Sequence, residues 1–462
     1  MTQKFTTKTG DANITHLNHR QSIAIIGSGV AGLTTGYLLS QKHDVTLYEA
    51  NGYLGGHTHT KNVTVKGITY PVNTGFIVYN DWTYPNFIKL MGRLGVENEA
   101  TDMSFSVRCE NTGLEYNGTT LNSLFAQRSN VFKPRFLRMV YDILRFNKMT
   151  VQNLQGDRIS DHETLGEFVY RHGFSDAFVN DYIVPMGAAI WSASVEAMKQ
   201  FPLKFFLQFF NNHGMLSVND RPQWRVISGG SSRYVKPLTR PYEDNIRLNT
   251  PIKTVIRNER EVILVDHNDQ RHHYDQVVFA CHSDQALRLL EKPSQAESDI
   301  LGSIPFQNNH VVLHTDTRLM PKRKLAWAAW NYHLPQRANA CAMVTYNMNI
   351  LQNFHDAPET FLVTLNRNAE IDPSKIIERY EYSHPVFTLD GVNAQRRHHE
   401  ISNKHRTHYC GAYWFNGFHE DGVNSALRVA KSFGLSLTED NNREKRSVLR
   451  ADAAPTSLAS HS

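Results

Sequence analysis

Two kinds of hydrophobic pattern follow each other along the first 50 residues of the chain. Residues 22–26 (SIAII) form a short apolar run typical of a buried strand, and an apolar stretch with helical spacing continues to about Ser40. A second run, DVTLYEA at 44–50, predicts another strand. A strand, a helix and a strand in this order predict a β-α-β unit whose two strands pair in parallel.

The composition and the hydrophobic periodicity of the sequence change twice further along. Residues 75–224 are rich in aromatic side chains and in helical periodicity, as in PRFLRMVYDILRFNKM at 134–149. Strand-like segments return after about residue 226, for example EVILVDHND at 261–269. The alternation of these patterns predicts an α/β fold with one domain inserted into another.

These patterns predict the domain boundaries. The α/β domain is expected to be discontinuous and to consist of residues 20–75, 225–295 and 400–434. The inserted, mixed α+β domain is expected to hold the substrate and to consist of residues 76–224 and 296–399. The polar ends, 1–20 and 435–462, are expected to be disordered.

Three glycines follow the first predicted strand in a G-x-G-x-x-G spacing. Gly27 permits a tight turn, Gly29 lets a pyrophosphate approach the backbone, and Gly32 lets the helix pack closely on the strand. The helix that begins near Val30 and Ala31 presents free N–H groups and a positive dipole end to phosphates. The triplet therefore predicts a dinucleotide site.

An acidic residue follows at the distance that such a site requires. Glu49 lies 20 residues after Gly29, at the end of the second predicted strand and beside Ala50. Its carboxylate can accept hydrogen bonds from ribose hydroxyls, whereas a 2′-phosphate would be repelled. The site is therefore expected to bind a dinucleotide other than NADP.

A second glycine pair identifies the expected dinucleotide. Gly55 and Gly56 complete an E-x5-G-G pattern with Glu49, and this pattern resembles flavoproteins of the glutathione-reductase-like and amine-oxidase superfamily. The resemblance implies FAD as the cofactor in a Rossmann-like domain of that type. It also implies that the glycine pair, with His57 and Thr58 after it, lies close to the FAD.

Two later segments resemble the same superfamily. IRLNTPIKTV at 246–255 is similar to the strand that holds the adenine, which implies a contact from Ile252. Residues 411–430 are similar to the closing segment at the flavin, which commonly reads E-G-A-x-x-S-G; this chain departs from it with Asp421 and Ala426 in place of two glycines. The flavin contacts implied there are Gly411, Glu420, Asp421, Gly422 and Val423.

Within the superfamily, the chain resembles a group of bacterial predicted FAD/NAD-binding oxidoreductases. The segments that carry this resemblance are GGHTHT at 55–60, VNTGFIVYN at 72–80, MSFSV at 103–107, NHGML at 212–216, WRVISGGSSRYV at 224–235 and GFHEDG at 417–422. Genes of this group often lie beside cyclopropane-fatty-acid synthases. That context implies a lipid acyl substrate.

One position departs from the wider superfamily. Many amine oxidases carry Arg directly after the glycine pair, whereas this chain carries His57. His57 can tune the charge of the flavin or form a covalent link to it, or it can be a structural hydrogen-bonding residue, and we favour the last. No third or fourth ligand at a recognisable spacing accompanies His57 and His59, so we expect no metal site.

Candidate catalytic residues lie next to the closing segment. Tyr413 and Trp414 are candidates for an aromatic wall that faces the substrate, with core packing as the alternative. His419 is the nearest titratable group and a candidate for proton handling, together with Glu420. Five phenylalanines in FPLKFFLQFF at 201–210 predict either a buried helix, which we favour, or the lining of an acyl-chain channel.

The leading hypothesis is an FAD-dependent oxidoreductase that removes a hydride from a C–H bond, with a lipid or fatty-acyl substrate favoured. An amine oxidase is an alternative. A non-catalytic FAD-binding partner of a lipid-modifying enzyme is another, because bound FAD does not by itself establish catalysis. An NAD-dependent dehydrogenase is disfavoured by the E-x5-G-G pattern and the closing segment.

The segment 128–148 is a basic amphipathic stretch. It carries six Lys and Arg residues against Asp142, and its apolar residues fall at helical spacing. One interpretation is a helix that lies on an anionic membrane; the other, slightly favoured, is a surface helix packed on the protein with a solvated basic face.

Composition limits the remaining possibilities. The 49 Lys and Arg against 44 Asp and Glu leave a net charge of +5, which gives no argument for nucleic-acid binding at this length. The four Cys contain no C-x-x-C pair, which favours reduced thiols and a cytoplasmic location. No apolar run approaches the roughly 20 residues of a membrane span, and the first 20 residues lack a signal peptide's apolar core. A protein of the cytoplasm, or one attached to the inner face of the membrane, is expected.

Overall fold

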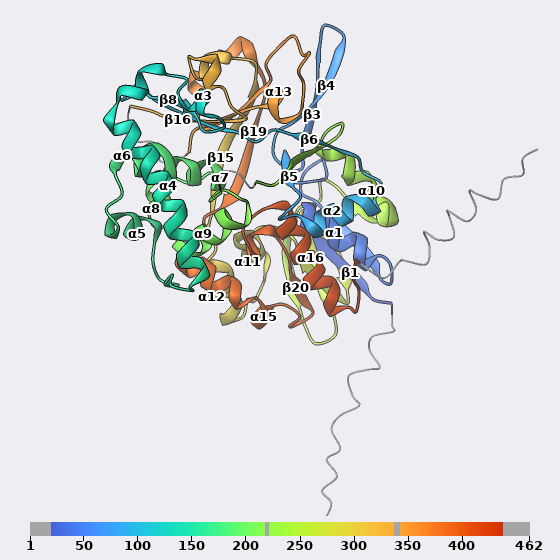
Figure 1. The fold of residues 1–462 in the computed structure, drawn as a ribbon. Coiled ribbons are helices and arrows are strands. Elements are labelled where there is room, and N and C mark those ends of the chain that lie inside the picture. The colour runs from blue at the N-terminus through green and yellow to red at the C-terminus, as the bar shows by residue number, and fades with distance from the viewer. Residues whose placement is uncertain (1–19, 218–220, 337–341, 438–462) are drawn as a thin grey trace, which may run out of the picture.

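A computed structural model describes residues 20–217, 221–336 and 342–437 of the chain (Figure 1). The predicted β-α-β unit is present in it. Strand β1 (Ser22–Ile26) leads into helix α1 (Val30–Leu39) and then into strand β2 (Asp44–Tyr48), and β1 pairs with β2 in parallel from Ser22–Asp44 to Ile26–Tyr48.

This unit forms the centre of a five-stranded parallel sheet with the order β10-β2-β1-β14-β20. The three added strands come from distant parts of the sequence: β10 (Ile246–Arg247), β14 (Gln276–Phe279) and β20 (Thr407–Tyr409). A parallel sheet is buried on both faces. Along β1, Ile23 and Ile25 enter one hydrophobic core, and Ala24 and Ile26 enter the other.

Helices cover one face of the parallel sheet, and a small sheet with helices covers the other. Helix α1 packs against α16 (His419–Ser432) and α10 (Val235–Thr239), and of its ten residues only Tyr37 is not buried. The opposite face packs on the antiparallel sheet of β11 (Ile252–Arg257), β12 (Val262–Asp266) and β13 (Arg271–Tyr274), and on helices α11 (Ser283–Leu289) and α12 (Gln295–Gly302). The predicted α/β fold with a Rossmann-like unit is confirmed.

A second large sheet has seven strands, in the order β19-β15-β18-β17-β16-β7-β8. Its strands are β19 (Ile376–Pro385), β15 (Phe306–His314), β18 (Leu362–Leu365), β17 (Val344–Asn347), β16 (Trp330–Leu334), β7 (Phe105–Cys109) and β8 (Glu115–Asn117). One end of it shares a core with a group of helices (left in Figure 1). Those helices are α4 (Pro134–Gln155), α5 (Leu165–Arg171), α6 (Asp176–Phe178), α7 (Val184–Trp191), α8 (Val195–Lys199) and α9 (Leu203–Asn212).

The two faces of the seven-stranded sheet differ in chemistry because side chains alternate along each strand. One face presents apolar and aromatic side chains, among them Trp330 and Tyr346, which are register partners on β16 and β17. The other face carries a buried polar ladder: His314 Nε2 lies 2.7 Å from Thr364 Oγ1, which lies 2.9 Å from Thr345 Oγ1.

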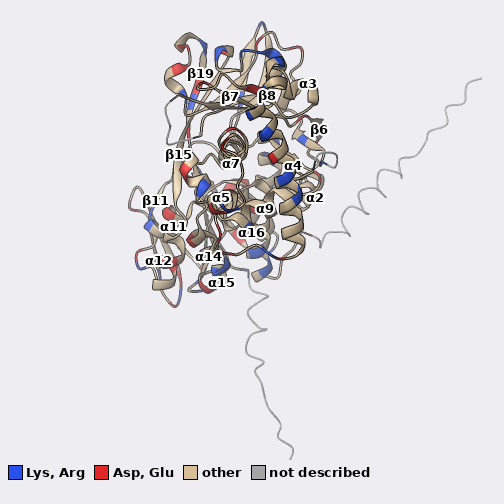
Figure 2. Cartoon of the chain, turned by 60° about the vertical axis from the view of Figure 1, so that its left-hand side comes forward, with Lys and Arg blue, Asp and Glu red and all other residues tan. Residues whose placement is uncertain are grey.

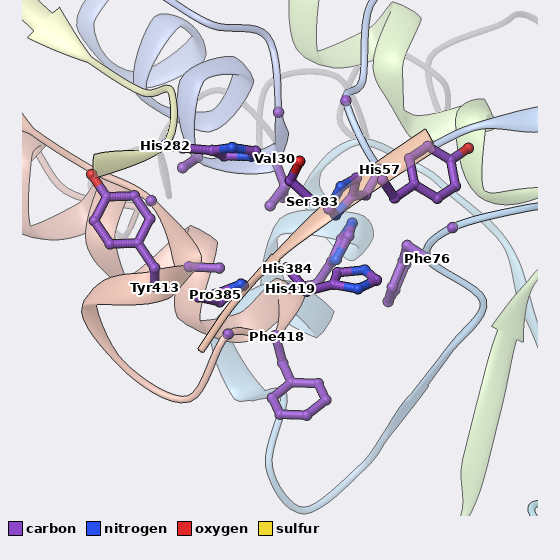
Figure 3. Close-up of a pocket in the computed structure, with 18 of the residues that line it drawn as sticks. Val30, His57, Phe76, His282, Ser383, His384, Pro385, Tyr413, Phe418 and His419 are labelled. Carbon is purple, nitrogen blue, oxygen red and sulfur yellow. The ribbon is translucent and has the colours of Figure 1, made fainter. Parts of the chain in front are cut away.

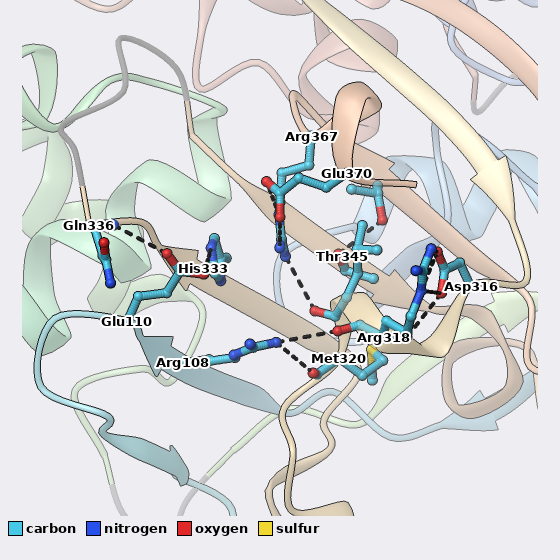
Figure 4. Close-up of polar contacts among 12 residues, drawn as sticks. Arg108, Glu110, Asp316, Arg318, Met320, His333, Gln336, Thr345, Arg367 and Glu370 are labelled. Atoms are coloured by element: carbon cyan, nitrogen blue, oxygen red, sulfur yellow. Dashed lines mark hydrogen bonds and ion pairs between the residues drawn. The ribbon is translucent and has the colours of Figure 1, made fainter. Parts of the chain in front are cut away.

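Charged side chains close over that polar face (Figure 4). The buried guanidinium of Arg367 pairs with Glu370 and donates to the carbonyl of Leu319, and Arg108 donates to the carbonyl of Met320 at 3.1 Å. Each buried polar group so paired avoids the desolvation cost of an unmade hydrogen bond. The polar face is therefore a supporting structure, and the apolar face is left to line a cavity.

Smaller elements connect the two large sheets. They are the hairpin of β3 (Thr60–Val65) and β4 (Ile68–Asn73), the sheet of β5 (Val78–Asn80), β9 (Trp224–Ile227) and β6 (Asn98–Thr101), and the helices α2 (Pro85–Arg93), α3 (Leu121–Leu124), α13 (Met348–Leu351), α14 (Leu389–Arg396) and α15 (His398–Ile401).

The ends of the chain differ in part from the expectation. The sequence predicts a disordered tail from residue 435, but Leu435 and Leu437 are buried, and the carbonyl of Leu437 accepts a hydrogen bond from Arg93 at 3.2 Å. The apolar pair extends the core beyond the end of α16. The remaining parts of both predicted tails, 1–19 and 438–462, lie outside the described residues.

Candidate active site

A cavity of about 730 Å³ lies between the carboxyl ends of β1 and β2 and the apolar face of the seven-stranded sheet. Open α/β sheets bind ligands at this edge, where neighbouring strands connect to opposite sides. Helix α1 follows β1 on one face of the sheet and α11 follows β14 on the other, so the cavity begins at such a point. It continues past the end of β19 to the helices α7 and α9.

The amino end of α1 faces the cavity and has no side-chain cap. Val30 and Ala31 line the cavity, and the N-cap residue Gly29 forms no capping hydrogen bond. A Cβ on Gly29 would meet nothing within 4 Å, so the space in front of this backbone is open. The first N–H groups of α1 are therefore free to bind an anionic group.

The other glycines of the triplet have packing roles. Gly27 has a φ of +107°, a conformation that L side chains rarely adopt. A Cβ on Gly32 would overlap the carbonyl oxygen of Gly27, so Gly32 lets α1 start directly against β1. Gly32 itself lies outside the cavity lining.

Glu49 lines the cavity at the end of β2, with Ala50 beside it. Its carboxylate is held by hydrogen bonds from the backbone N–H and hydroxyl of Ser28, at 3.0 and 2.6 Å, and from the backbone N–H of Asn51 at 2.9 Å. These bonds fix the orientation of the carboxylate. Ile252, the predicted adenine contact, lines the same end of the cavity together with Thr250 and Pro251.

The second glycine pair lies directly against the first turn. A Cβ on Gly56 would lie 3.2 Å from the Cα of Gly29, and Gly55 donates its N–H to the carbonyl of Ser28 at 3.0 Å. Both glycines have positive φ and both line the cavity. They bring the backbone that follows, beginning with His57, into the cavity wall.

Four histidines surround the middle of the cavity: His57, His282, His384 and His419 (Figure 3). The ring of His57 lies 5.2 Å from that of His384 and 4.9 Å from that of Tyr382. Burial lowers the pKa of His57 well below its usual value, and the neighbouring histidines lower it further. Burial lowers the pKa of His384 to about 4. These rings are therefore neutral near pH 7.

His419 is held by a stacked ring and two hydroxyls. Its ring stacks on that of Phe76, with 3.4 Å between the ring centroids and 12° between the planes, and the two side chains lie next to each other in Figure 3. Its Nε2 lies 2.9 Å from the hydroxyl of Thr58 and 3.1 Å from that of Tyr234. Burial lowers the pKa of His419 to about 3. Its geometry suits positioning, and its weak basicity does not suit proton uptake at neutral pH.

Several predicted cofactor contacts lie behind the cavity wall. Thr58 is outside the lining and bonds to Tyr234 and His419. The carboxylate of Glu420 accepts hydrogen bonds from the backbone N–H groups of Asn86 and Phe87, at 3.1 and 2.7 Å. It therefore caps the amino end of α2, a role that an acidic side chain performs well.

The next three residues of α16 are also outside the lining. Asp421 accepts a hydrogen bond from the backbone N–H of Phe418 at 2.9 Å, and burial raises its pKa to about 7. A Cβ on Gly422 would overlap the side chain of Val30, so this glycine lets α16 approach α1. Val423 is fully buried in the core between them. Gly422 and Val423 thus pack α16 against α1, and Asp421 holds the first turn of α16 itself.

Tyr413 and Trp414, the two residues predicted to form an aromatic wall facing the substrate, lie in different environments. Tyr413 lines the cavity together with Gly411, and in Figure 3 it lies on the other side of the view from His419 and Phe76. Trp414 is outside the lining and is packed edge-on against His398, with 4.5 Å between the ring centroids. Of the five phenylalanines at 201–210, only Phe209 lines the cavity, and the helix around it is core, as favoured.

Some cavity residues were not identified from the sequence. Phe76 and Gly75 come from the quoted segment VNTGFIVYN, where a Cβ on Gly75 would overlap the carbonyl oxygen of His57. Gly75 is therefore a feature of the sequence that indicates a close approach of two backbone segments here. His282 follows the strand at 274–281, and His384 lies at the end of a long strand without a motif, so neither had a local signal.

The neutral state of His419 predicts a pH dependence of stability. Its folded pKa of about 3 lies below the usual 6.5, so as the pH falls from 6.5 towards 3 the unfolded chain gains a proton that the folded chain does not. The folded state then loses about 1.4 kcal/mol per pH unit from this residue. His419→Gln should flatten the fall in the free energy of unfolding by that slope, measured by denaturant titration between pH 7 and 4.5. Equal slopes in both proteins would show that His419 titrates normally.

The chain matches one family model and shares its fold with several proteins of known structure. A family model described as "Flavin containing amine oxidoreductase" matches residues 30–432. A putrescine oxidase variant shares 15% identity over 90% of this chain and 98% of that chain, with a TM-score of 0.64. Cyclohexylamine oxidase from Brevibacterium oxydans shares 13% identity over 90% and 99%, with a TM-score of 0.64.

A further solved structure is a CLA-producing fatty acid isomerase from P. acnes, which shares 16% identity over 89% of this chain and 98% of that chain, with a TM-score of 0.65. At these identities the solved structures show the fold alone. No curated protein matches the sequence.

The residues of the cavity fit an FAD molecule. The uncapped end of α1 and the open space at Gly29 suit a pyrophosphate, and the fixed carboxylate of Glu49 suits a ribose. The same cavity extends from Ile252 past Gly56 and His57, which leaves room for the rest of the molecule. Among the described residues, no group of three or more His, Cys, Asp or Glu is arranged to hold a metal ion.

Proposed function

The chain belongs to the flavin-containing amine oxidoreductase family, and from that premise we propose that it removes a hydride from a C–H bond of a neutral, apolar substrate of the acyl-lipid class. The chain is an FAD-dependent oxidoreductase by its family. The choice of substrate class rests on the part of the cavity that lies beyond the histidines.

That part of the cavity, which we call the chamber, is lined by apolar and aromatic side chains from both the helices and the seven-stranded sheet. They are Met103, Ile190, Trp191, Phe209, Met215, Trp224, Val311, Trp330, Tyr346, Leu365, Phe387 and Phe418. A chamber of this kind gains its affinity from burial of apolar ligand surface. A hydrocarbon chain provides such a surface along its whole length.

Charged side chains are confined to the ends of the cavity. Among the described lining residues the only Asp, Glu, Lys or Arg are Glu49, Arg288 and Glu381. Glu49 belongs to the dinucleotide end. Arg288 pairs with Asp284 at 2.7 Å, Glu381 accepts a hydrogen bond from Asn308 at 2.8 Å, and both line a polar recess that adjoins the cavity.

The titratable residues of the chamber are neutral as well. Burial lowers the pKa of His213 to about 4, and it raises the pKa of Tyr346 above its usual value. An ammonium group that entered this chamber would lose its hydration without gaining a carboxylate partner, which is costly. The absence of an ionised partner, among the described residues, is the observation that carries the proposal.

In the proposed reaction, different residues of the chain have different roles. The flavin, when bound, accepts the hydride. The amino end of α1 and Glu49 hold the dinucleotide, and the rings of His419 and Phe76 form a rigid neutral wall beside it. The aromatic chamber orients the chain of the substrate and excludes water from the reacting carbon.

Two further arguments support an acyl substrate. The sequence resembles a bacterial group whose genes often lie beside cyclopropane-fatty-acid synthases. A fatty acid isomerase is among the proteins that share the fold, so this fold accommodates an acyl chain in at least one case. Putrescine oxidase and cyclohexylamine oxidase share it too, and an amine oxidase is the alternative that the experiment must separate.

Product analysis tests the proposal. The purified, FAD-loaded protein is incubated in air with a bacterial lipid extract, or with putrescine, cyclohexylamine and oleylamine, and the products are identified by mass spectrometry. We expect lipid products that have lost two hydrogen atoms, one as hydride and one as a proton, with dioxygen as the final acceptor. Aldehydes or ketones from the amines alone would favour the amine oxidase, and lipids of unchanged mass with a moved double bond would contradict a net oxidation.

A further inference from the structure

Exposed apolar side chains are concentrated in one short part of the chain. Of the 13 large apolar residues that are exposed among the described residues, six fall within residues 121–144. They are Leu121, Val131, Phe132, Leu137, Tyr141 and Leu144, with Phe132 86% and Leu121 77% exposed. Single exposed apolar residues are common on proteins, but a cluster of this kind marks an interaction site. We call these six residues the apolar strip.

The strip arises because α4 has two apolar faces. Phe136, Met139 and Phe146 point inward and are buried in the core that α4 shares with α9. Leu137, Tyr141 and Leu144 are spaced by four and three residues, so they share the opposite face. The spacing of six apolar residues predicts that all of them share one side of the helix: Phe132, Phe136, Met139, Val140, Ile143 and Leu144. The structure corrects this prediction, because Phe132 and Leu144 are exposed.

Cationic side chains border the strip. Lys148 is exposed one turn beyond Leu144, and Arg128 and Lys133 lie before α4. Among the described residues, these three side chains form no ion pair with a carboxylate, and Arg128 donates only to Asn122 and to the carbonyl of Phe125. Figure 2 shows Lys and Arg along α4, on the side of the molecule turned to the viewer.

The other cations of α4 are partly neutralised. Asp142 is buried and accepts hydrogen bonds from Arg138 and Arg145, at 3.1 and 3.2 Å, and Asp181 pairs with Arg135. Six cations therefore face two carboxylates within this region, which leaves an excess of four positive charges. Neither carboxylate belongs to the exposed face, because both are almost fully buried.

We infer that the apolar strip and its flanking cations form a docking surface for an anionic lipid bilayer. Apolar side chains that project from a helix lying along the surface can enter the boundary between headgroups and acyl chains, and Lys and Arg beside them attract anionic headgroups. A protein partner with a dry, neutral groove would bury the cations at a cost, whereas a bilayer pairs them with phosphates. Among the described residues no helix is long and apolar enough to cross a membrane.

The surface lies one helix layer away from the cavity. Helix α4 packs on α9, and Phe209 of α9 is part of the cavity wall. Phe146 of α4 and Phe209 belong to the same core, so the strip and the chamber are opposite sides of one packed unit. The inference rests on the exposed strip and its charges and is independent of which bond the enzyme oxidises.

Vesicle flotation tests the inference. The full chain with bound FAD is mixed with vesicles of phosphatidylglycerol and phosphatidylcholine, or of phosphatidylcholine alone, at low and at near-physiological salt. We expect binding to the anionic vesicles that weakens with salt. Phe132→Asp with Leu144→Asp should reduce the bound fraction at least ~10-fold, and Lys133→Gln with Lys148→Gln should reduce it on anionic vesicles. Both double variants should keep their FAD, because none of these residues lines the cavity.

A matched control and an oligomer measurement make the result decisive. Ile68→Asp changes a side chain that is 57% exposed on the β3–β4 hairpin, away from the strip, and should leave vesicle binding intact. The inference is overturned if the unaltered protein binds no vesicle at low salt, or if Ile68→Asp weakens binding as much as the strip variant does. It is also overturned if light scattering detects a dimer that the strip variant abolishes, because a second copy would then cover the strip.

Discussion

Replacing Gly29 with Val is expected to give a folded protein without FAD. The φ of Gly29 is −65°, which any residue adopts, and a Cβ there would meet no atom of the protein within 4 Å. The added side chain would instead occupy the open space in front of the amino end of α1, where we expect the pyrophosphate of FAD to approach the backbone. We expect the affinity for FAD to fall on the order of 100-fold or more.

The measurement is the FAD content of the purified protein, together with the thermal unfolding of the FAD-free form. Gly92→Val is the matched control, because a Cβ at Gly92 also meets nothing within 4 Å but lies on α2, outside the cavity. Gly92→Val should remain yellow. Full FAD occupancy in Gly29→Val would mean that the dinucleotide does not lie against this turn.

A charged side chain in the wall of the chamber is expected to slow the reaction strongly. Met215 lines the cavity beyond His213 and is partly buried, so a carboxylate there would place a charge in an apolar wall. For Met215→Glu we expect the rate of flavin reduction by an acyl substrate to fall roughly 100-fold, because burying an unpaired charge is costly. Met215→Leu nearly conserves volume and apolar character, and we expect a small change.

Anaerobic stopped-flow absorbance measures both rates. The FAD content of each variant serves as the internal control, because Met215 lines the apolar part of the cavity and not the end that holds Glu49 and Ile252. Should Met215→Glu reduce flavin with an acyl substrate as fast as Met215→Leu does, the apolar chamber would not be the substrate site. A gain of activity towards amines in Met215→Glu would fit the account, since the new carboxylate provides the missing partner for an ammonium group.

The parallel-sheet part of the fold could be predicted from sequence because its signals are local. The run SIAII, the three glycines and the run that contains Glu49 lie within 30 residues, and each has a direct mechanical meaning. The order of the remaining strands had no such signal. β10, β14 and β20 join the same sheet from positions separated by up to 160 residues, and only tertiary packing determines which strands become neighbours.

Residue roles near the flavin were harder to predict for a physical reason. A motif places a segment beside the cofactor, but the direction of each side chain depends on the helix that carries it. Residues 420–423 begin α16, so their side chains turn towards α2 and α1, while the backbone before them, at Gly411 and Tyr413, lines the cavity. The resemblance indicated a segment that lines the cavity only in part, and it could not distinguish which side chains face the cavity and which face the core.

The substrate chamber could not be derived from any single segment. Its walls come from α7, α9, β9 and four strands of the seven-stranded sheet, and each contributes one or two side chains. Trp330 and Tyr346 become neighbours only through the register of β16 and β17. For the phenylalanines at 201–210 the favoured interpretation of a buried helix is confirmed, because α9 packs in the core and only Phe209 of the five lines the cavity.

Anaerobic reduction of the bound flavin by a matched pair of substrates tests directly whether the chamber selects a neutral acyl chain over an amine. Methyl oleate and oleylamine share a hydrocarbon chain and differ in the polar end, so both can fill the chamber but only the amine carries an ammonium group. The account predicts that the ester, or an oleoyl phospholipid, bleaches the yellow flavin absorbance and that the amine does so more slowly or not at all. Bleaching by the amine, with the acyl substrates leaving the flavin oxidised, would contradict it.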